Sequence, residues 1–181
     1  MISRITLPAR VFAVVLATIT AAAVTPPACA CNADGEQAIF SCEAVHGRKF
    51  IELCAPAPLS AQDGYLRYRF GAQDKDGNEA RVELAYPDDL DGSLARFYAA
   101  VYTYKGVYTQ SVRFTRGGYD YRVYTEARGA RELGAGVEVR DRKSGKTTRI
   151  ACSERPRFYI WELKGLVACD PETPVGKACL K

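Results

Sequence analysis

The sequence predicts an all-β fold: one antiparallel β-sandwich or barrel-like domain with about ten short strands, cross-linked by disulfides. Apolar and polar residues alternate with a period of two in short segments, and turn-forming residues separate these segments. No long segment shows the 3.6-residue period of a helix. Cysteines are frequent for a chain of this length, seven in 181 residues, and six of them follow a predicted export signal.

Residues 1–30 have the form of a signal peptide. Arg4 and Arg10 make the start positive, residues 11–24 are apolar or small, and Ala28-Cys29-Ala30 has the small-x-small form of a cleavage site. We therefore expect residues 31–181 to form a single periplasmic or secreted domain without a transmembrane segment. A lipoprotein with Cys31 at its start is the second alternative, since Ala28 stands where a larger aliphatic residue is usual.

Cleavage after residue 30 removes Cys29 and leaves an even number of cysteines, which indicates three disulfides in an exported protein. We expect Cys42–Cys54 across a hairpin and Cys169–Cys179 around a short loop, which leaves Cys31–Cys152. Because six cysteines permit fifteen pairings, the other connectivities stay open.

The first half of the mature chain contains two expected pairs of strands before an acidic loop. The expected strands are residues 38–45, 48–54, 64–71 and 79–86. The later chain contains a charged segment at 127–135, expected to be a loop or a brief helical turn, and a hairpin of 136–140 with 147–152. A last strand at 157–163 and an irregular tail at 171–181 follow. We expect Trp161 to be a core aromatic of that last strand.

Residues 97–126 predict three consecutive strands, because two tight turns define the register of each neighbouring pair. Turns at Lys105-Gly106 and Gly117-Gly118 place Tyr104 opposite Val107 and Arg116 opposite Tyr119. Both registers then gather one mainly apolar set on one face: Phe97, Ala99, Val101, Tyr108, Val112, Phe114, Tyr121 and Val123.

The same registers predict a polar second face of tyrosines and arginines. It carries Tyr98, Tyr102, Tyr104, Ser111, Arg113, Asp120, Arg122 and Tyr124. Arg113 lies opposite Arg122, and like charges directly opposed on a sheet are unfavourable. Three explanations are open: Glu126, Asp120 or solvent compensates this repulsion, the inferred register is wrong, or the face is a patch for an anion or an acidic partner.

Composition argues against several classes of function. Removal of residues 1–30 takes away two arginines and leaves a net charge of +2, too balanced to indicate nucleic-acid binding. Asp74–Asn78 begins like a calcium loop, but Glu79 stands where Gly is needed and Ala85 where the bidentate Glu should be. His46 is the single histidine and has no metal-binding or nucleophile motif around it. We expect no metal, no cofactor and no catalytic residues, although a carboxylate-based hydrolase would leave no local motif.

Three short stretches resemble pieces of bacterial periplasmic lysozyme inhibitors. They are Phe40-Ser41-Cys42, Gly117-Gly118-Tyr119-x-x-Arg122-x-Tyr124 and Trp161-x-x-Lys164-Gly165. Members of that family are small disulfide-bonded β domains that insert a loop into the acidic cleft of a lysozyme. The resemblance implies that Tyr119 and Arg122, or Lys164, bond to the catalytic carboxylates. Arg116 departs from the pattern, since such inhibitors have Ser before the Gly.

We therefore expect an exported, non-enzymatic binding protein whose partner is another protein, with a lysozyme-type cell-wall hydrolase first among the partners. The alternatives are a carbohydrate- or envelope-binding module that uses the tyrosine and arginine face, and a carboxylate-based hydrolase. The candidate binding residues are Tyr98, Tyr102, Arg113, Tyr119, Arg122, Tyr124 and Lys164.

Overall fold

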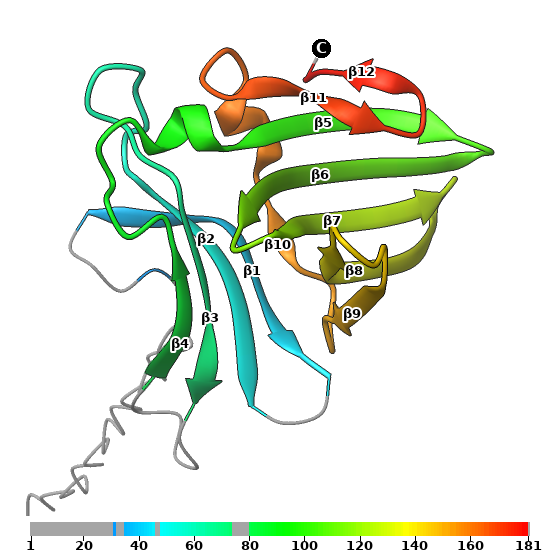
Figure 1. Cartoon of the computed structure of the whole chain (residues 1–181), viewed down its shortest axis with the longest axis horizontal. Coiled ribbons are helices and arrows are strands. Elements are labelled where there is room, and N and C mark those ends of the chain that lie inside the picture. The colour runs from blue at the N-terminus through cyan, green and yellow to red at the C-terminus, as the bar shows by residue number, and fades with distance from the viewer. Residues whose placement is uncertain (1–30, 32–34, 46–47, 74–79, 181) are drawn as a thin grey trace, which may run out of the picture.

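The computed structural model describes residue 31 and residues 35–45, 48–73 and 80–180, and in this part of the chain the fold is all-β (Figure 1). The predicted signal peptide, His46 and the segment Asp74–Asn78 lie outside the described residues. Two β-sheets pack against each other in a sandwich-like arrangement. Within the described ranges, neither of the two short helices is long or apolar enough to cross a membrane.

The first sheet has five strands in the order β10-β1-β2-β3-β4, and every neighbouring pair is antiparallel. Its strands are β1 (Glu36–Ala44), β2 (Lys49–Pro56), β3 (Arg67–Gln73), β4 (Ala80–Tyr86) and β10 (Arg157–Phe158). The four expected strands of the first half of the chain are thereby confirmed, with ends shifted by a few residues.

The second sheet has seven strands in the order β12-β11-β5-β6-β7-β8-β9. Its strands are β5 (Tyr98–Tyr104), β6 (Val107–Arg116), β7 (Tyr119–Arg128), β8 (Arg131–Asp141), β9 (Thr147–Ala151), β11 (Ala168–Thr173) and β12 (Gly176–Ala178). Only the β11–β5 pair is parallel among these described strands. The helices η1 (Ser93–Arg96) and η2 (Ile160–Leu163) are single 3-10 turns.

The predicted register of β5, β6 and β7 is confirmed. Tyr104 pairs with Val107, and Arg116 pairs with Tyr119. Lys105, Gly106, Gly117 and Gly118 all have positive φ values, as two-residue hairpin turns of the primed type require. The turn residues therefore determine which side chains face the core.

The core lies between the two sheets. Phe114 of β6 is its aromatic centre, with ring centroids 4.6 Å from Tyr86, 4.9 Å from Tyr121 and 5.0 Å from Tyr68. Phe97, Ala99, Val112 and Val123 of the predicted apolar face are fully or almost fully buried. The seven-stranded sheet thus presents its apolar face to the five-stranded sheet and its polar face outward.

The disulfides differ in part from the expected set. Cys169 pairs with Cys179 as expected, but Cys31 pairs with Cys54 and Cys42 pairs with Cys152. The expected Cys31–Cys152 and Cys42–Cys54 pairings are wrong because the register places Cys42 opposite Ile51, with its side chain on the core side of β1. Cys54 lies on the opposite face of β2, where it meets Cys31.

Cys152 also joins the two sheets at one edge. It follows β9 and forms a bridge with Ala44 at the end of β1. The amide of Val45 donates to the carbonyl of Ala151 at 2.8 Å, and the amide of Ser153 donates to that of Glu43 at 2.7 Å. The Cys42–Cys152 disulfide therefore lies where the sheets meet.

Three expectations for the second half of the chain are wrong. Residues 127–135 extend β7 and β8 instead of forming a loop, and the tail contains the β11–β12 hairpin instead of irregular structure. Trp161 is 47% exposed in η2 rather than buried in a strand. Ile160 and Leu163 take the core positions of η2, since residues three apart lie on one side of a 3-10 helix.

Candidate binding site on the seven-stranded sheet

The outward side of the seven-stranded sheet, here called the outer face, carries most of the predicted binding residues. Tyr98 and Tyr102 come from β5, Arg113 from β6, and Arg122 and Tyr124 from β7. Strand alternation places all five on the side opposite Val112 and Val123. Arg113 and Arg122 are directly opposed, as predicted.

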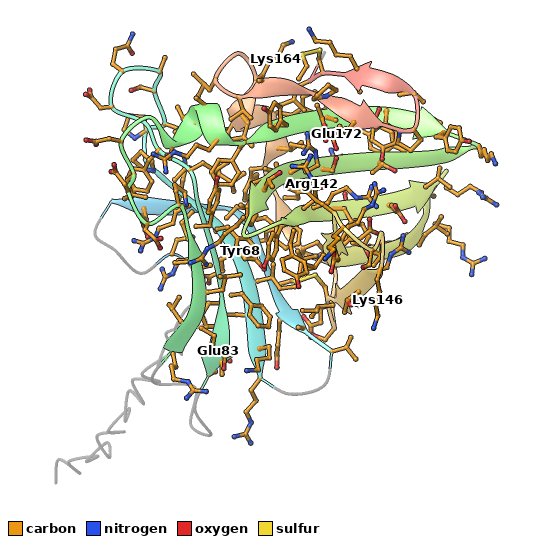
Figure 2. The ribbon with its side chains drawn as sticks, viewed as in Figure 1. Tyr68, Glu83, Arg142, Lys146, Lys164 and Glu172 are labelled. Atoms are coloured by element: carbon orange, nitrogen blue, oxygen red, sulfur yellow. A yellow bond between two sulfur atoms is a disulfide. The ribbon has the colours of Figure 1, made fainter. Side chains whose placement is uncertain are left out.

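Arg113 is held by carboxylates from two other strands. Its Nε lies 3.0 and 3.1 Å from the two oxygens of Asp170, and its Nη2 lies 2.9 Å from Oδ1 of the same residue. Asp120 and Glu172 are each 3.8 Å away, and Glu172 reaches toward β6 from β11 (Figure 2). Burial opposes the charge of Arg113, but the bonds to Asp170 outweigh it and raise the pKa of the guanidinium.

Arg122 is bound more loosely than Arg113. Its Nη1 donates to the Tyr102 hydroxyl at 3.1 Å, and its Nη2 lies 3.4 Å from Glu138 and 3.7 Å from Glu126. Glu138 also accepts a 2.7 Å hydrogen bond from Arg149 of β9. The repulsion between the opposed arginines is therefore compensated by carboxylates on their own and neighbouring strands.

The tyrosine rings of the outer face are partly covered by these arginines. The guanidinium of Arg113 lies 4.7 Å from the Tyr98 ring centroid, and that of Arg122 lies 5.2 Å from the Tyr124 ring centroid. Tyr124 is only 4% exposed, and Arg149 covers it as well. Tyr124 therefore offers no open ring on which a ligand could stack.

A groove of about 180 Å³ opens between these side chains and the tip of the β11–β12 hairpin. Ser111, Arg113 and Arg122 belong to the strands under the groove, and Thr173 and Pro174 belong to the hairpin. Ser111 is 1% exposed, and its hydroxyl oxygen has no hydrogen-bond partner among the described residues. A buried hydroxyl without a partner is costly to the folded state.

Acidic groups slightly outnumber basic ones around the groove. Its charged lining consists of Arg113, Arg122, Arg140, Asp120, Glu138, Asp170 and Glu172. Four carboxylates against three guanidinium groups do not favour an anion. The charge balance therefore argues against the predicted patch for an anion or an acidic partner.

Of the seven predicted binding residues, Tyr102, Arg113 and Arg122 line the groove. Tyr98 and Tyr124 lie on the outer face without lining it, and the other two lie elsewhere. Tyr119 follows the β6–β7 turn, pairs with Arg116 and is 42% exposed. Lys164 follows η2 and is exposed near the start of β11 (Figure 2). Neither residue lines the groove.

Several groove residues escaped the sequence analysis. Glu138 could have been placed opposite Arg122 by extending the alternation of β7 into β8. Asp170 and Glu172 carry no such signal, because β11 returns to β5 in parallel from a distant part of the chain. Parallel neighbours cannot be identified from turn chemistry, which links only consecutive antiparallel strands.

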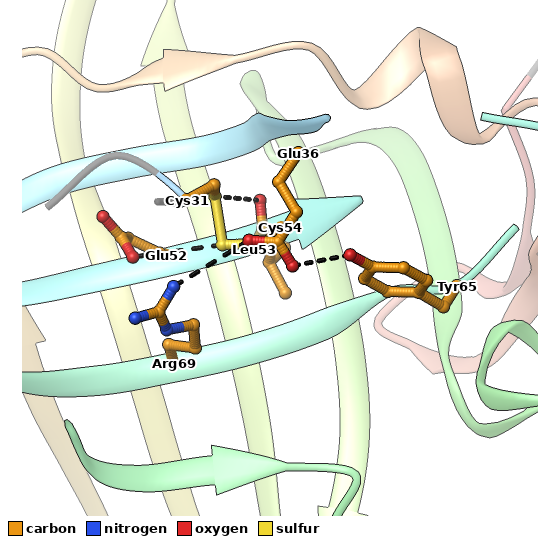
Figure 3. Close-up of a disulfide and its surroundings, with 7 residues drawn as sticks. All are labelled: Cys31, Glu36, Glu52, Leu53, Cys54, Tyr65 and Arg69. Atoms are coloured by element: carbon orange, nitrogen blue, oxygen red, sulfur yellow. Dashed lines mark hydrogen bonds and ion pairs between the residues drawn. A yellow bond between two sulfur atoms is a disulfide. The ribbon is translucent and has the colours of Figure 1, made fainter. Parts of the chain in front are cut away.

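A second polar cluster surrounds the Cys31–Cys54 disulfide on the five-stranded sheet (Figure 3). Glu52 is fully buried there, with Oε2 3.9 Å from Cys54 Sγ and no hydrogen-bond partner for Oε1 among the described residues. Burial raises the pKa of Glu52 to about 7, although Arg69 and the Cys31 amide pull it down. The two sulfurs are bonded to each other and are not thiolate metal ligands, and the buried carboxyl group offers no access to a substrate.

Comparisons with protein-family models, curated proteins and solved structures find no match to this chain. Fold and site together define a class, a disulfide-cross-linked β-sandwich-like protein with a polar groove on its larger sheet.

Proposed function

We propose that this protein is an exported, non-enzymatic binding protein that docks a protein partner through the groove of the outer face. Three disulfides support an oxidising compartment such as the periplasm or the exterior. The observation that carries the proposal is the groove between the tip of the β11–β12 hairpin and side chains that ion pairs already hold in place. Such rigid, pre-positioned groups favour binding, because little conformational freedom is lost on association.

The size of the groove favours one anchoring side chain over a larger free ligand. Pockets for small-molecule ligands usually measure about 300 Å³ or more. At about 180 Å³, this groove is smaller. Protein interfaces often concentrate their binding energy in one side chain that enters such a socket.

The chemistry of the groove favours a basic or neutral polar anchor. Asp120, Glu138 and Glu172 supply acceptors around it, and Ser111 can donate or accept. An acidic anchor would meet four carboxylates, whereas Arg113 is already committed to Asp170. The ion pairs of these carboxylates also support binding over catalysis, since a general acid or base needs a free, tuned carboxyl group.

A lysozyme-type hydrolase is the first partner to test, on the strength of the sequence resemblance. Arg122 is held by Tyr102, Glu126 and Glu138, so it is a poor donor to a foreign carboxylate. Lys164 is exposed and has no ion pair among those found in the described residues. If a hydrolase cleft is bound through its acidic residues, Lys164 is the better donor.

The test uses residues 31–181 with all three disulfides formed and a panel of lysozymes. We expect binding and inhibition, and we expect Pro174→Trp, which fills the groove at the hairpin tip, to weaken both. Val175→Trp is the matched control, because Val175 is exposed on the same turn but does not line the groove.

A second pair of variants tells whether a hydrolase is bound through the groove or through Lys164. Loss of inhibition in Lys164→Glu, but not in Lys177→Glu, assigns the contact to Lys164. If no lysozyme binds, the hydrolase partner is excluded. If a partner binds the Pro174→Trp variant as tightly as the wild type, the groove is excluded as the docking site.

A further inference from the structure

A larger cavity lies on the other side of the seven-stranded sheet. It measures about 400 Å³ and opens between the sheets, where the outer ends of β6, β7 and β8 face the segment before and within β10. Strand β10 has only two residues, so the five-stranded sheet ends early here. Small residues at the β7–β8 turn, Gly129 and Ala130, leave further space.

Aromatic rings from both sheets line this cavity. Tyr108 comes from β6 and Phe158 from β10. Phe158 is held edge-on against Phe40, with ring centroids 5.1 Å apart. Tyr108 is 39% exposed, and no cation–π or ring contact covers it among the described residues. The cavity therefore offers open aromatic surface, unlike Tyr124 on the outer face.

Polar groups occupy the rest of the lining. The Gln110 carbonyl oxygen accepts from the Thr125 hydroxyl at 3.2 Å, while its amide nitrogen is 3.5 Å from the Tyr108 hydroxyl, too long for a strong bond. At the mouth, Arg155 is 3.7 Å from Glu132, and its side chain is 89% exposed. An exposed pair of this kind is weak and easily rearranged by a ligand.

We propose that this cavity binds an uncharged saccharide of one or two pyranose rings. Its volume lies within the range of small-molecule sites, about 300–1,000 Å³. The apolar face of a pyranose can stack on Tyr108, and its hydroxyls can pair with Gln110 and Thr125.

Other ligand classes fit less well. A hydrocarbon would strip water from Gln110, Thr125 and the Glu132 carboxylate without replacing their hydrogen bonds. An anion would meet Glu132, and the one arginine of the described lining, Arg155, is already paired with it.

The saccharide site and the groove can be occupied together. Gln110 and Ser111 are adjacent on β6, and their side chains point to opposite faces of the sheet. A glycan in the cavity and a protein anchor in the groove therefore do not compete for space. The protein would then bring a protein partner to a glycan.

The test is a titration of the ¹⁵N-labelled, disulfide-bonded protein with maltose, cellobiose and N,N′-diacetylchitobiose, followed by amide chemical shifts. We expect millimolar binding to at least one sugar, with shifts in the outer ends of β6 and β7, the β7–β8 turn and residues 155–158. Tyr108→Ala should weaken binding about tenfold, the loss expected when one stacked ring is removed. Tyr104→Ala is the matched control, since Tyr104 is similarly exposed, at 41% against 39%, but lies outside the cavity.

Absence of binding to all three sugars, shifts elsewhere on the molecule, or equal effects of the two tyrosine variants would each overturn the proposal. Pro174→Trp fills the groove and should leave saccharide binding unchanged. The saccharide proposal is therefore tested independently of the groove proposal.

Discussion

Glu52 shows how much a single buried group can matter in this protein. Its carboxyl group is fully enclosed beside the Cys31–Cys54 disulfide, and burial raises its pKa from 4.5 to about 7. The folded protein therefore holds this proton at pH values where the unfolded chain has released it. Stability from this group is fully present below about pH 4.5 and is lost as the pH rises to about 7.

The first prediction concerns Glu52→Gln, which mimics the protonated acid at every pH. The variant should be more stable than the wild type at pH 8, by about 3 kcal/mol from a shift of 2.5 pKa units, and about equal to it at pH 4. Urea unfolding at several pH values measures the difference between the two proteins. A difference that stays constant with pH would show that Glu52 titrates normally in the folded state.

The β11–β12 hairpin joins the seven-stranded sheet through β5, although no tight turn links β11 to β5. Strand β11 pairs with β5 through only two residue pairs, Ala168 with Tyr98 and Cys169 with Ala99. The buried Arg113–Asp170 contact links the same hairpin to β6. This attachment matters for the proposed docking because the hairpin tip forms one side of the groove.

The second prediction is that Asp170→Asn destabilises the protein by about 3–5 kcal/mol, because it leaves Arg113 buried without its main counter-charge. Arg81→Ala is the control: it removes an ion pair whose arginine is 80% exposed and should cost at most about 1 kcal/mol. Chemical unfolding measures both. Similar losses in the two variants would contradict a structural role for the Arg113–Asp170 pair.

The third prediction compares two disulfides. The Cys42–Cys152 bond spans 110 residues and the Cys169–Cys179 bond spans 10. In the chain-entropy model their removal costs about 5 and about 3 kcal/mol respectively. The free energies of unfolding of the two double-alanine variants should show this order. The reverse order would mean that the Cys42–Cys152 bond contributes little to stability.

The sequence was most informative where neighbouring strands are consecutive in the chain. The turns at Lys105-Gly106 and Gly117-Gly118 determined the register of β5, β6 and β7, and with it the outward position of Arg113 and Arg122. Contacts between distant segments could not be derived in the same way. Cys42 meets Cys152 because a bridge joins Ala44 to Cys152, and Arg113 meets Asp170 because β11 pairs with β5, and no local pattern encodes either pairing.

At the scale of the whole molecule, the two sides of the seven-stranded sheet differ, because the five-stranded sheet packs against only one of them. One side forms the core and, beyond the end of β10, the larger cavity. The other side holds an ion-paired polar face with a groove under the β11–β12 hairpin. The disulfides hold the sheets and the hairpin in place, so both hollows are positioned before any ligand arrives.

The most direct test of the groove as a docking surface is site-specific photo-cross-linking. A photoreactive phenylalanine analogue at Tyr102, which lines the groove, is compared with the same analogue at Tyr159, which is 56% exposed near η2 and away from it. If the groove is the docking surface, we expect a discrete protein adduct from envelope or secreted proteins at position 102, weakened by Pro174→Trp, and none at position 159. No adduct at position 102, or the same adduct at both positions, would contradict it.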